Sequence, residues 1–433
     1  MKILIISHEL WSENNNGGNV LSNIFSDFDA EFAQIYCSPG TPNNKLCKKY
    51  FQITDKMIIN GLLKKKQIGK EINFEEFPYE AKFATKLDIE TKKWYFNIFK
   101  KYRFSIFSTI RELLWKISPW KTKELERFIL EFNPDVIFAP CYSHLFMLRL
   151  DRYVKKITNI NMISYISDDN YSLRQFNLSP FYWFNRILSR TYIKKTFKDY
   201  NLVYTMTEEQ SDELEQSLAA NMKILRKGAE FSGECKKVDV NDPIKIVYAG
   251  GIYINRWKIL AKIGEVLRNI NKEGVKIILN IYTQNAVTEK QQHLLHDDKN
   301  IFLNPAVSQA ELIEIYKSSD IALHVESFEL KYRLMTRLSF STKIVDCLAS
   351  TCAVMAISWK EHAGLKYLRK NNAAICIDDF SDLDDELKKI AENPELVIDY
   401  ANKAWLCGQK NHQIKMIHQD IYNDFKHLMF KYT

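Results

Sequence analysis

The chain has 433 residues, of which 46% are hydrophobic and 26% are charged. These proportions are ordinary for a globular protein, and they exclude a disordered, collagen-like or disulfide-stapled chain. Lys and Arg number 61 against 53 Asp and Glu, so the formal net charge is +8. A basic balance indicates an acidic partner, such as nucleic acid, a phosphorylated substrate or a membrane surface.

Strand and helix patterns alternate from the first residues onward. Continuous apolar, β-rich runs, typical of strands buried on both faces, open each half at 2–7 and 244–250. Helical spacing of apolar residues is clear at 121–132, 181–197, 257–270, 309–317 and 343–349. Further strands are expected at 33–38, 135–140, 161–167, 201–206, 275–282, 300–304, 320–325, 352–357 and 373–378.

This alternation predicts an α/β fold with two tandem Rossmann-like domains that face each other across a cleft. We expect the first domain at 1–231 and the second at 244–393. A polar segment with Gly and Pro forms the expected linker, 232–243. The last stretch, 394–433, is helical, and we expect it to cross back to the first domain.

Cysteine usage and the N-terminus bear on the compartment. The eight cysteines include no C-x-x-C pair, so we expect no metal site. The apolar run at the N-terminus is short and is followed at once by His8 and Glu9, unlike a signal sequence. No run of 18 apolar residues is present. The expected location is therefore the cytoplasm.

Ligands of open parallel sheets bind beyond the carboxyl ends of the strands, so the loops after strands are informative. Gly17 and Gly18 follow the first strand, where glycine lets the backbone approach a phosphate or an acceptor. The alternative is a plain turn, since the G-x-G-x-x-G pattern is absent. Asp168 and Asp169 follow the strand at 161–167 and could bind sugar hydroxyls, act as a base or hold a metal. Their alternative role is to cap the next helix.

Two loops in the second half favour an anionic ligand. Gly250 and Gly251 end a strand, and Arg256 and Lys258 then open a helix, where cations are unfavourable unless an anion such as a diphosphate docks there. The alternative is a pair of solvated surface cations.

The second of these loops opens the helix at 343–349. Ser341, Thr342 and Lys343 stand at a helix start that suits a phosphate. Asp346, one turn on, could accept hydrogen bonds from a ribose diol, or it could merely offset the helix dipole.

The segment L-S-F-S-T-K-I-V-D-C-L-A-S-T-C-A-V-M, 338–355, resembles the E-x7-E region of the GT-B glycosyltransferases of family four. Asp346 stands for the second Glu of that pattern, which in the family binds the nucleotide ribose. Leu338 replaces the first Glu, which touches the donor sugar, and Glu326 is expected to do part of its work. Thr351 stands where Gly is usual.

The resemblance extends to other loops. Arg256 and Lys258 are similar to the family's diphosphate-binding Arg and Lys, at a shorter spacing, and Gly17 and Gly18 are similar to its glycine loop. Near Asp168 the family often carries a His, so that His role has no direct counterpart here.

The resemblance implies transfer of a sugar from a nucleotide-sugar donor to a glycan or lipid-linked acceptor in cell-surface polysaccharide biosynthesis. It implies no obligatory metal or other cofactor. If the anomeric centre is inverted, Asp168 or Asp169 is the candidate base. Two alternatives stay open: a nucleotide-sugar epimerase of the same fold, and a non-catalytic subunit that binds a nucleotide or a partner.

The formal charge excess lies in one segment. Residues 61–123 hold 15 Lys and Arg against 7 Asp and Glu, an excess of 8. Within it, 91–121 combines cations with aromatic residues, which is typical of a membrane interface on anionic lipid. The alternatives are an amphipathic helix packed on the first domain or an RNA-binding surface. We expect a peripheral location on the inner face of the membrane and no nucleic-acid partner.

Overall fold

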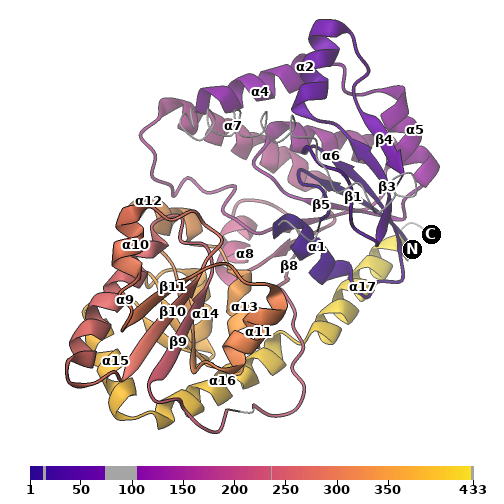
Figure 1. The fold of residues 1–433 in the computed structure, drawn as a ribbon. Coiled ribbons are helices and arrows are strands. Elements are labelled where there is room, and N and C mark those ends of the chain that lie inside the picture. The colour runs from indigo at the N-terminus through magenta and orange to yellow at the C-terminus, as the bar shows by residue number, and fades with distance from the viewer. Residues whose placement is uncertain (13–15, 74–104, 236, 431–433) are drawn as a thin grey trace. The chain divides into compact units, whose positions relative to one another are not determined.

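The structure, a computed structural model, describes residues 1–12, 16–73, 105–235 and 237–430. It contains two compact units (Figure 1). The first comprises 1–173, 177–225 and 418–433, and the second comprises 174–176 and 226–417. The C-terminal helical stretch is therefore divided between the two units, because its last helix belongs mostly to the first.

The first unit is built on an eight-stranded sheet in the order β4-β3-β2-β1-β5-β6-β7-β8. All neighbouring strands are parallel except β3 and β4. The strands are β1 Lys2–Ser7, β2 Glu31–Tyr36, β3 Cys47–Gln52, β4 Lys70–Asn73, β5 Val136–Pro140, β6 Met162–Ile166, β7 Leu202–Thr205 and β8 Met222–Ile224. Its helices are α1 Asn16–Phe25, α2 Asp55–Lys64, α4 Ser105–Ile117, α5 Lys123–Phe132, α6 Leu145–Thr158, α7 Pro180–Thr196 and α8 Glu208–Glu215, with a 3-10 turn at Phe197–Asp199.

The second unit is built on a six-stranded parallel sheet in the order β11-β10-β9-β12-β13-β14. Its strands are β9 Ile244–Ala249, β10 Ile277–Tyr282, β11 Ile301–Asn304, β12 Ile321–Val325, β13 Ala353–Ile357 and β14 Ile375–Ile377. Its helices are α9 Arg256–Ile270, α10 Glu289–Leu295, α11 Gln309–Lys317, α12 Leu330–Thr336, α13 Thr342–Leu348, α14 Ala363–Lys370, α15 Asp382–Glu392 and α16 Glu395–Asn411, with a 3-10 turn at Asn271–Glu273. Helix α17, Ile414–Phe430, follows.

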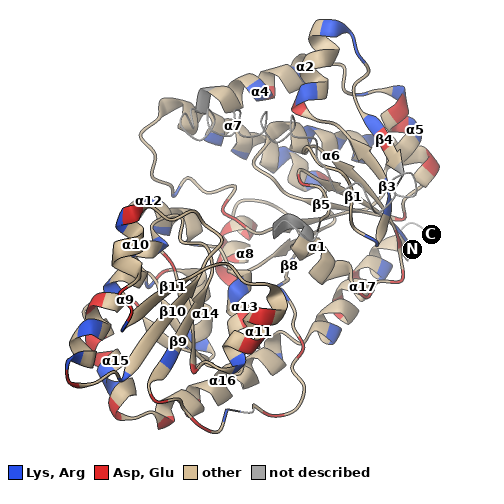
Figure 2. Cartoon of the chain, viewed as in Figure 1, with Lys and Arg blue, Asp and Glu red and all other residues tan. Residues whose placement is uncertain are grey.

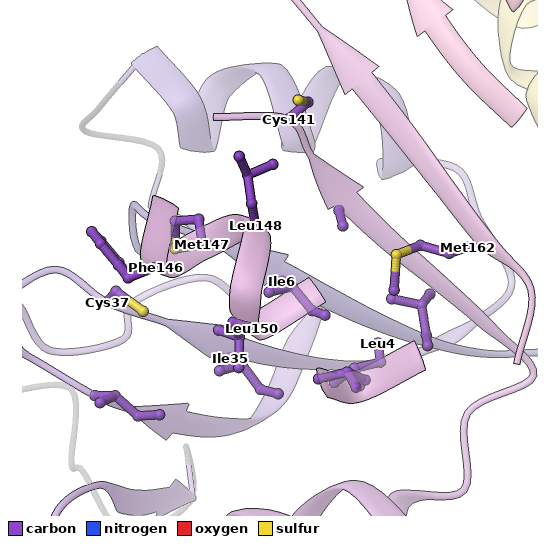
Figure 3. Close-up of a cluster of buried hydrophobic side chains, with 14 of the residues drawn as sticks. Leu4, Ile6, Ile35, Cys37, Cys141, Phe146, Met147, Leu148, Leu150 and Met162 are labelled. Atoms are coloured by element: carbon purple, nitrogen blue, oxygen red, sulfur yellow. The ribbon is translucent and has the colours of Figure 1, made fainter. Parts of the chain in front are cut away.

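The core of the first unit lies between its sheet and the helices that pack on it. Leu4 on β1, Ile35 on β2 and Leu148 on α6 are fully buried and belong to one cluster (Figure 3). Such apolar burial is the main favourable term in folding. The apolar runs that predicted the strands are thus the residues that form the core.

These sheets confirm the predicted fold class of two tandem α/β domains. The strands predicted from apolar runs are present within one to two residues at each end. Strand β3 was not predicted, because Lys48 and Lys49 interrupt its apolar residues and face solvent. Strands β4 and β8 are short and lie at the two edges of the sheet, where burial on both faces is not required.

The predicted glycine loop after β1 is wrong in its placement. Helix α1 begins at Asn16, so Gly17 and Gly18 lie in its first turn rather than in an open loop. The two glycines interrupt the apolar pattern, and this is why the sequence indicated a loop at these positions. None of the described helices is long and apolar enough to cross a membrane.

Thr351 is one of the residues at which this chain departs from the E-x7-E pattern. Its φ is 63°, in the left-handed region, where the pattern carries Gly. A β-branched residue is strained there because its side chain approaches the following carbonyl. This turn connects α13 to β13, so Thr351 holds a backbone conformation that favours Gly, at a conformational cost.

We therefore predict that Thr351→Gly stabilises the protein by about 1 kcal/mol, the relief of strain being partly offset by the greater freedom of glycine in the unfolded chain. Urea unfolding of the variant and the wild type measures this difference. Thr191→Gly, at an exposed position inside helix α7, is the control and should lower stability by about 0.3 kcal/mol. Destabilisation by Thr351→Gly would contradict the argument.

Candidate functional site

The second sheet has a point where the strand order reverses. From β9 the chain proceeds to β10 and β11 on one side, and then returns to β12 on the other side of β9. Ligands of open α/β sheets bind at the carboxyl edge of such a switch point. Gly250 follows β9 and Glu326 follows β12, so the parallel pairing of these strands brings their loops together.

Arg256 and Glu326 form a buried, bidentate ion pair at this edge. The guanidinium donates from Nε to Oε2 at 3.1 Å and from Nη2 to Oε1 at 2.6 Å. The side chains are only 11% and 4% exposed. Burial by itself would lower the pKa of Arg256, but the carboxylate of Glu326 outweighs it, and the pKa is raised. The pair holds a permanent cation at the first turn of α9.

Lys343 supplies a second cation beside it. A Cβ atom at position 250 would lie 2.2 Å from Lys343 Nζ, so Gly250 is the residue that leaves room for this ammonium group. Nζ also lies 5.9 Å from the centre of the Tyr248 ring. Burial, and then the charge of Arg256, lower the pKa of Lys343. A buried ammonium group next to another cation favours an anionic ligand.

Two histidines behind Glu326 were not predicted. His324 lies on β12 and His362 precedes α14, with their ring centres 6.3 Å apart. His362 Nδ1 accepts from Leu365 N, and the Nε2 atoms of both rings are buried without a partner. Burial lowers the pKa of both rings. Sequence reasoning passed over His324 because it stands inside an apolar strand.

Other predicted donor residues make different contacts. Lys258 Nζ pairs with Glu329 at 2.5 Å and is half exposed. Asp346 Oδ1 accepts from Lys227 Nζ at 2.5 Å. Gly251 O accepts from Tyr248 Oη at 2.7 Å. The structure therefore gathers Gly250, Arg256, Glu326 and Lys343 around one point.

The remaining predicted donor residues begin α13. Ser341 is the N-cap residue of this helix, without a side-chain capping bond, and Thr342 and Lys343 form its first turn. Leu338, at the position of the pattern's first Glu, is buried. The carboxylate at the carboxyl edge of the second sheet comes instead from Glu326, directly after β12.

The two carboxylates after β6, in the first unit, differ in their surroundings. Asp169 accepts from Ser172 N at 2.8 Å and pairs with Arg186 at 3.0 Å, and its side chain is 2% exposed. It stabilises its own loop rather than capping a helix. Asp168 is exposed, and its backbone oxygen accepts from Gln210 Nε2 at 3.1 Å. Asp168 is thus the better placed of the two to meet a substrate.

No group of three or more His, Cys, Asp or Glu side chains suited to a metal ion occurs among the described residues. The cluster at the carboxyl edge of the second sheet combines two cations, Arg256 and Lys343, with one carboxylate, Glu326, and its excess of positive charge suits an anion.

The chain was compared with protein-family models and with curated proteins. Residues 267–422 match the family model described as glycosyl transferase-like. The match covers 156 of the 433 residues, and the fold of the chain is that of the GT-B glycosyltransferases. No curated protein matches it in sequence.

Solved structures cover nearly the whole chain at low identity. Sucrose-phosphate synthase from Thermosynechococcus elongatus has a TM-score of 0.61 and 10% identity, covering 99% of this chain and 98% of its own. Anabaena HepE in complex with UDP has a TM-score of 0.62 and 12% identity, covering 98% and 100%. An Escherichia coli structure titled "Trehalose-6-phosphate", bound with UDP-2-fluoro glucose, has a TM-score of 0.58 and 10% identity, covering 98% and 99%. These structures confirm the predicted fold.

We predict that Arg256→Ala weakens binding of a nucleoside diphosphate by about 1.5–3 kcal/mol, the range for hydrogen bonds to charged groups. Isothermal titration with UDP and GDP measures the change. Lys262→Ala is the control, because Lys262 lies on the same helix and pairs with Glu265 at the surface. Unchanged affinity in Arg256→Ala would remove Arg256 from the donor site.

Removing Arg256 also leaves Glu326 buried without its partner, which is costly to stability. A double variant, Arg256→Ala with Glu326→Gln, removes this penalty. It should fold as well as the wild type and still bind nucleoside diphosphate weakly, so that a loss of affinity is separated from a loss of fold.

Proposed function

We propose that the protein transfers a glycosyl group from a nucleoside diphosphate sugar to a hydroxyl of a glycan or lipid-linked acceptor, in the synthesis of cell-surface polysaccharide. The observation that carries the proposal is the pair of buried cations, Arg256 and Lys343, beside Gly250 at the switch point of the second sheet. The UDP and UDP-2-fluoro glucose named for the similar structures support a donor of this class.

Donor binding is proposed to exchange the partner of Arg256. In the described structure two N–H groups of its guanidinium, on Nε and Nη2, donate to Glu326. A diphosphate offers pairs of oxygens that a guanidinium binds in bidentate fashion, as it binds a carboxylate, and it carries more charge, so it can take over these N–H groups. Glu326 is then released next to His324, whose Nε2 lies 3.9 Å from Oε1. The released carboxylate is placed to accept hydrogen bonds from the donor sugar.

The chemical step places negative charge on the leaving group. The bond from the anomeric carbon to the diphosphate oxygen breaks, and that oxygen keeps the electron pair. Arg256 and Lys343 stabilise the growing charge in a site with little water. The acceptor oxygen forms the new bond to the anomeric carbon, and its proton passes to a base. Asp168 is the candidate for this base if the anomeric centre is inverted.

The nucleoside part of the donor is assigned to α13. Asp346 would accept hydrogen bonds from the ribose diol while remaining paired with Lys227, because a carboxylate has room for several donors. Ser341 and Thr342 would meet the phosphate from the start of the same helix. Gly251 and Lys258 would complete the loop after β9.

A turnover assay separates this proposal from its alternatives. The protein is incubated with a panel of nucleotide sugars, with and without a membrane extract, and nucleoside diphosphate release is followed. We expect release that depends on the extract, because the extract supplies the acceptor. An interconverted sugar without release would point to an epimerase. Nucleotide binding without turnover would indicate a non-catalytic subunit.

Contact with an anionic membrane is part of the proposal, and it rests on helices α4 and α7. Part of the predicted membrane segment, 91–104, lies outside the described residues, but α4 is described. It exposes a row of large apolar side chains at helical spacing, Phe107, Ile110, Leu113 and Ile117. Helix α7 exposes a second row, Phe181, Phe184 and Ile187.

The two rows belong to neighbouring helices. Thr109 Oγ1 on α4 donates to Asn185 Oδ1 on α7 at 3.0 Å. Helix α7 has no acidic residue, and its last turn carries the exposed Lys194 and Lys195 (Figure 2). An apolar face with basic residues is typical of a helix that lies in the membrane interface. This contact would place the protein on the inner face of the membrane, at the site of a lipid-linked acceptor.

We predict that Leu113→Glu with Phe184→Glu reduces binding to vesicles of phosphatidylglycerol and phosphatidylcholine at least fivefold, because each change puts a charge into the apolar face. Co-sedimentation measures the bound fraction. Leu130→Glu is the matched control, since Leu130 on α5 is 57% exposed, as Phe184 is. Equal binding by wild type and double variant would contradict the membrane contact.

A further inference from the structure

The first sheet also has a switch point, between β1 and β5. From β1 the chain proceeds to β2 and β3, and it returns to β5 on the other side of β1. His8 directly follows the end of β1, and Tyr142 and His144 follow the end of β5. These three aromatic residues therefore lie at the edge where an open sheet binds its ligand.

Arg111 fixes the protonation of His144. Its Nη2 lies 2.8 Å from His144 Nδ1. A guanidinium only donates, so Nδ1 accepts and the ring proton is on Nε2. The His144 ring also stacks on Phe146, with ring centres 5.6 Å apart and an interplanar angle of 8°. Arg111 itself lies over the other ring of this stack, 5.1 Å from the centre of Phe146.

His8 lies against this assembly. Its ring centre is 5.2 Å from that of His144 and 6.1 Å from that of Tyr142. Burial, aided by the charge of Arg111, lowers the pKa of His8 to about 4. His8 is therefore neutral at neutral pH, and a neutral imidazole offers one acceptor nitrogen. Among the described residues, the two ring nitrogens of His8 have no hydrogen-bond partner, and neither does Nε2 of His144. Both residues are partly exposed, so a ligand can reach these nitrogens.

The surroundings hold this pair rigidly. Glu112 accepts from Leu145 N at 3.0 Å and from Phe146 N at 2.9 Å, which anchors the start of α6 directly after His144. Trp115 stacks on Phe146 with ring centres 4.3 Å apart and donates from Nε1 to Asp55 at 2.7 Å. Side chains locked in this way are typical of binding sites, where fixed donors and acceptors give specificity.

We propose that His8 and His144 form a subsite for a hydroxyl group of the acceptor sugar, in which His144 Nε2–H donates and His8 accepts. The inference rests on the proposed glycosyl transfer and names the residues that orient its acceptor. Arg111 is a positioning residue, because it acts through the tautomer of His144.

A neutral hydroxyl fits better than an anion. The charge of Arg111 is already directed at His144 Nδ1 and Phe146. Two carboxylates act on the same residues, Asp55 on His8 and Glu9 on Tyr142. The subsite is therefore close to neutral, whereas the edge of the second sheet is cationic. Paired donor and acceptor groups on aromatic walls are what a sugar hydroxyl requires.

Ring NMR of the full chain, labelled with 15N in its nine histidines, tests the geometry without any turnover. We expect His144 as the Nε2–H tautomer. Glucose, galactose and N-acetylglucosamine are titrated, and at least one should shift the His8 and His144 signals while the buried His324 and His362 stay unchanged. A proton on His144 Nδ1 would overturn the inference. A response to inorganic phosphate but to none of the sugars would also overturn it.

Kinetics with the acceptor extract give the second test. A Gln amide can replace Nε2–H of a histidine and an Asn amide cannot reach it, so His144→Gln should keep at least a third of the wild-type kcat/KM for acceptor. His144→Asn and Arg111→Met should lose at least tenfold in kcat/KM for acceptor, with the Kd for nucleoside diphosphate unchanged. His293→Asn, at an exposed position of α10, is the control. Equal activity of all four variants would overturn the subsite.

Failure of this inference is distinguishable from failure of the proposed function. If the wild type turns over no donor with any extract, glycosyl transfer fails, while the NMR titration still reports on the subsite. If the wild type is active and His144→Asn is as active as His144→Gln, only the subsite fails.

Discussion

The feature on which the rest depends is the parallel pairing of strands around two switch points. In each sheet the chain leaves a central strand in one direction and returns to its other side, so β1 lies beside β5 and β9 lies beside β12. Because all four strands run parallel, their carboxyl ends carry adjacent loops. Residues far apart in the sequence, such as Arg256 and Glu326, come into contact because of this strand pairing, and not because of any pattern in the sequence around them.

The two edges differ in electrostatics in a way that suits two different ligands. At the second sheet, the cations Arg256 and Lys343 are largely shielded from solvent, and the carboxylate of Glu326 balances the charge of Arg256. At the first sheet, burial keeps His8 neutral and Arg111 gives its charge to a histidine ring. The proposed diphosphate donor and the proposed sugar hydroxyl would require this contrast, since a cationic acceptor subsite would compete for the diphosphate.

Glu326 lies at the sheet edge where the family's motif would lead one to expect a different carboxylate. The family pattern places a carboxylate at the position of Leu338, and here that position is buried and apolar. A carboxylate at the same sheet edge comes from the end of β12 instead, and in the described structure it also holds Arg256 in place. The pair avoids an isolated buried charge, which would be costly for either residue alone.

The sequence by itself determined the α/β class, the two sheets and most of their strands, because strands buried on both faces require continuous apolar runs and these runs are visible in one dimension. It also indicated Arg256, Lys343 and Gly250, since glycines after a strand and cations at a helix start are local signals. Tertiary structure alone decided the partners: Glu326 for Arg256, Lys227 for Asp346 and Arg186 for Asp169. It alone revealed the His8 and His144 pair, whose members are separated by 136 positions. Ion pairs and ring contacts join residues whose separation along the chain follows no period, so only the folded sheet brings them together.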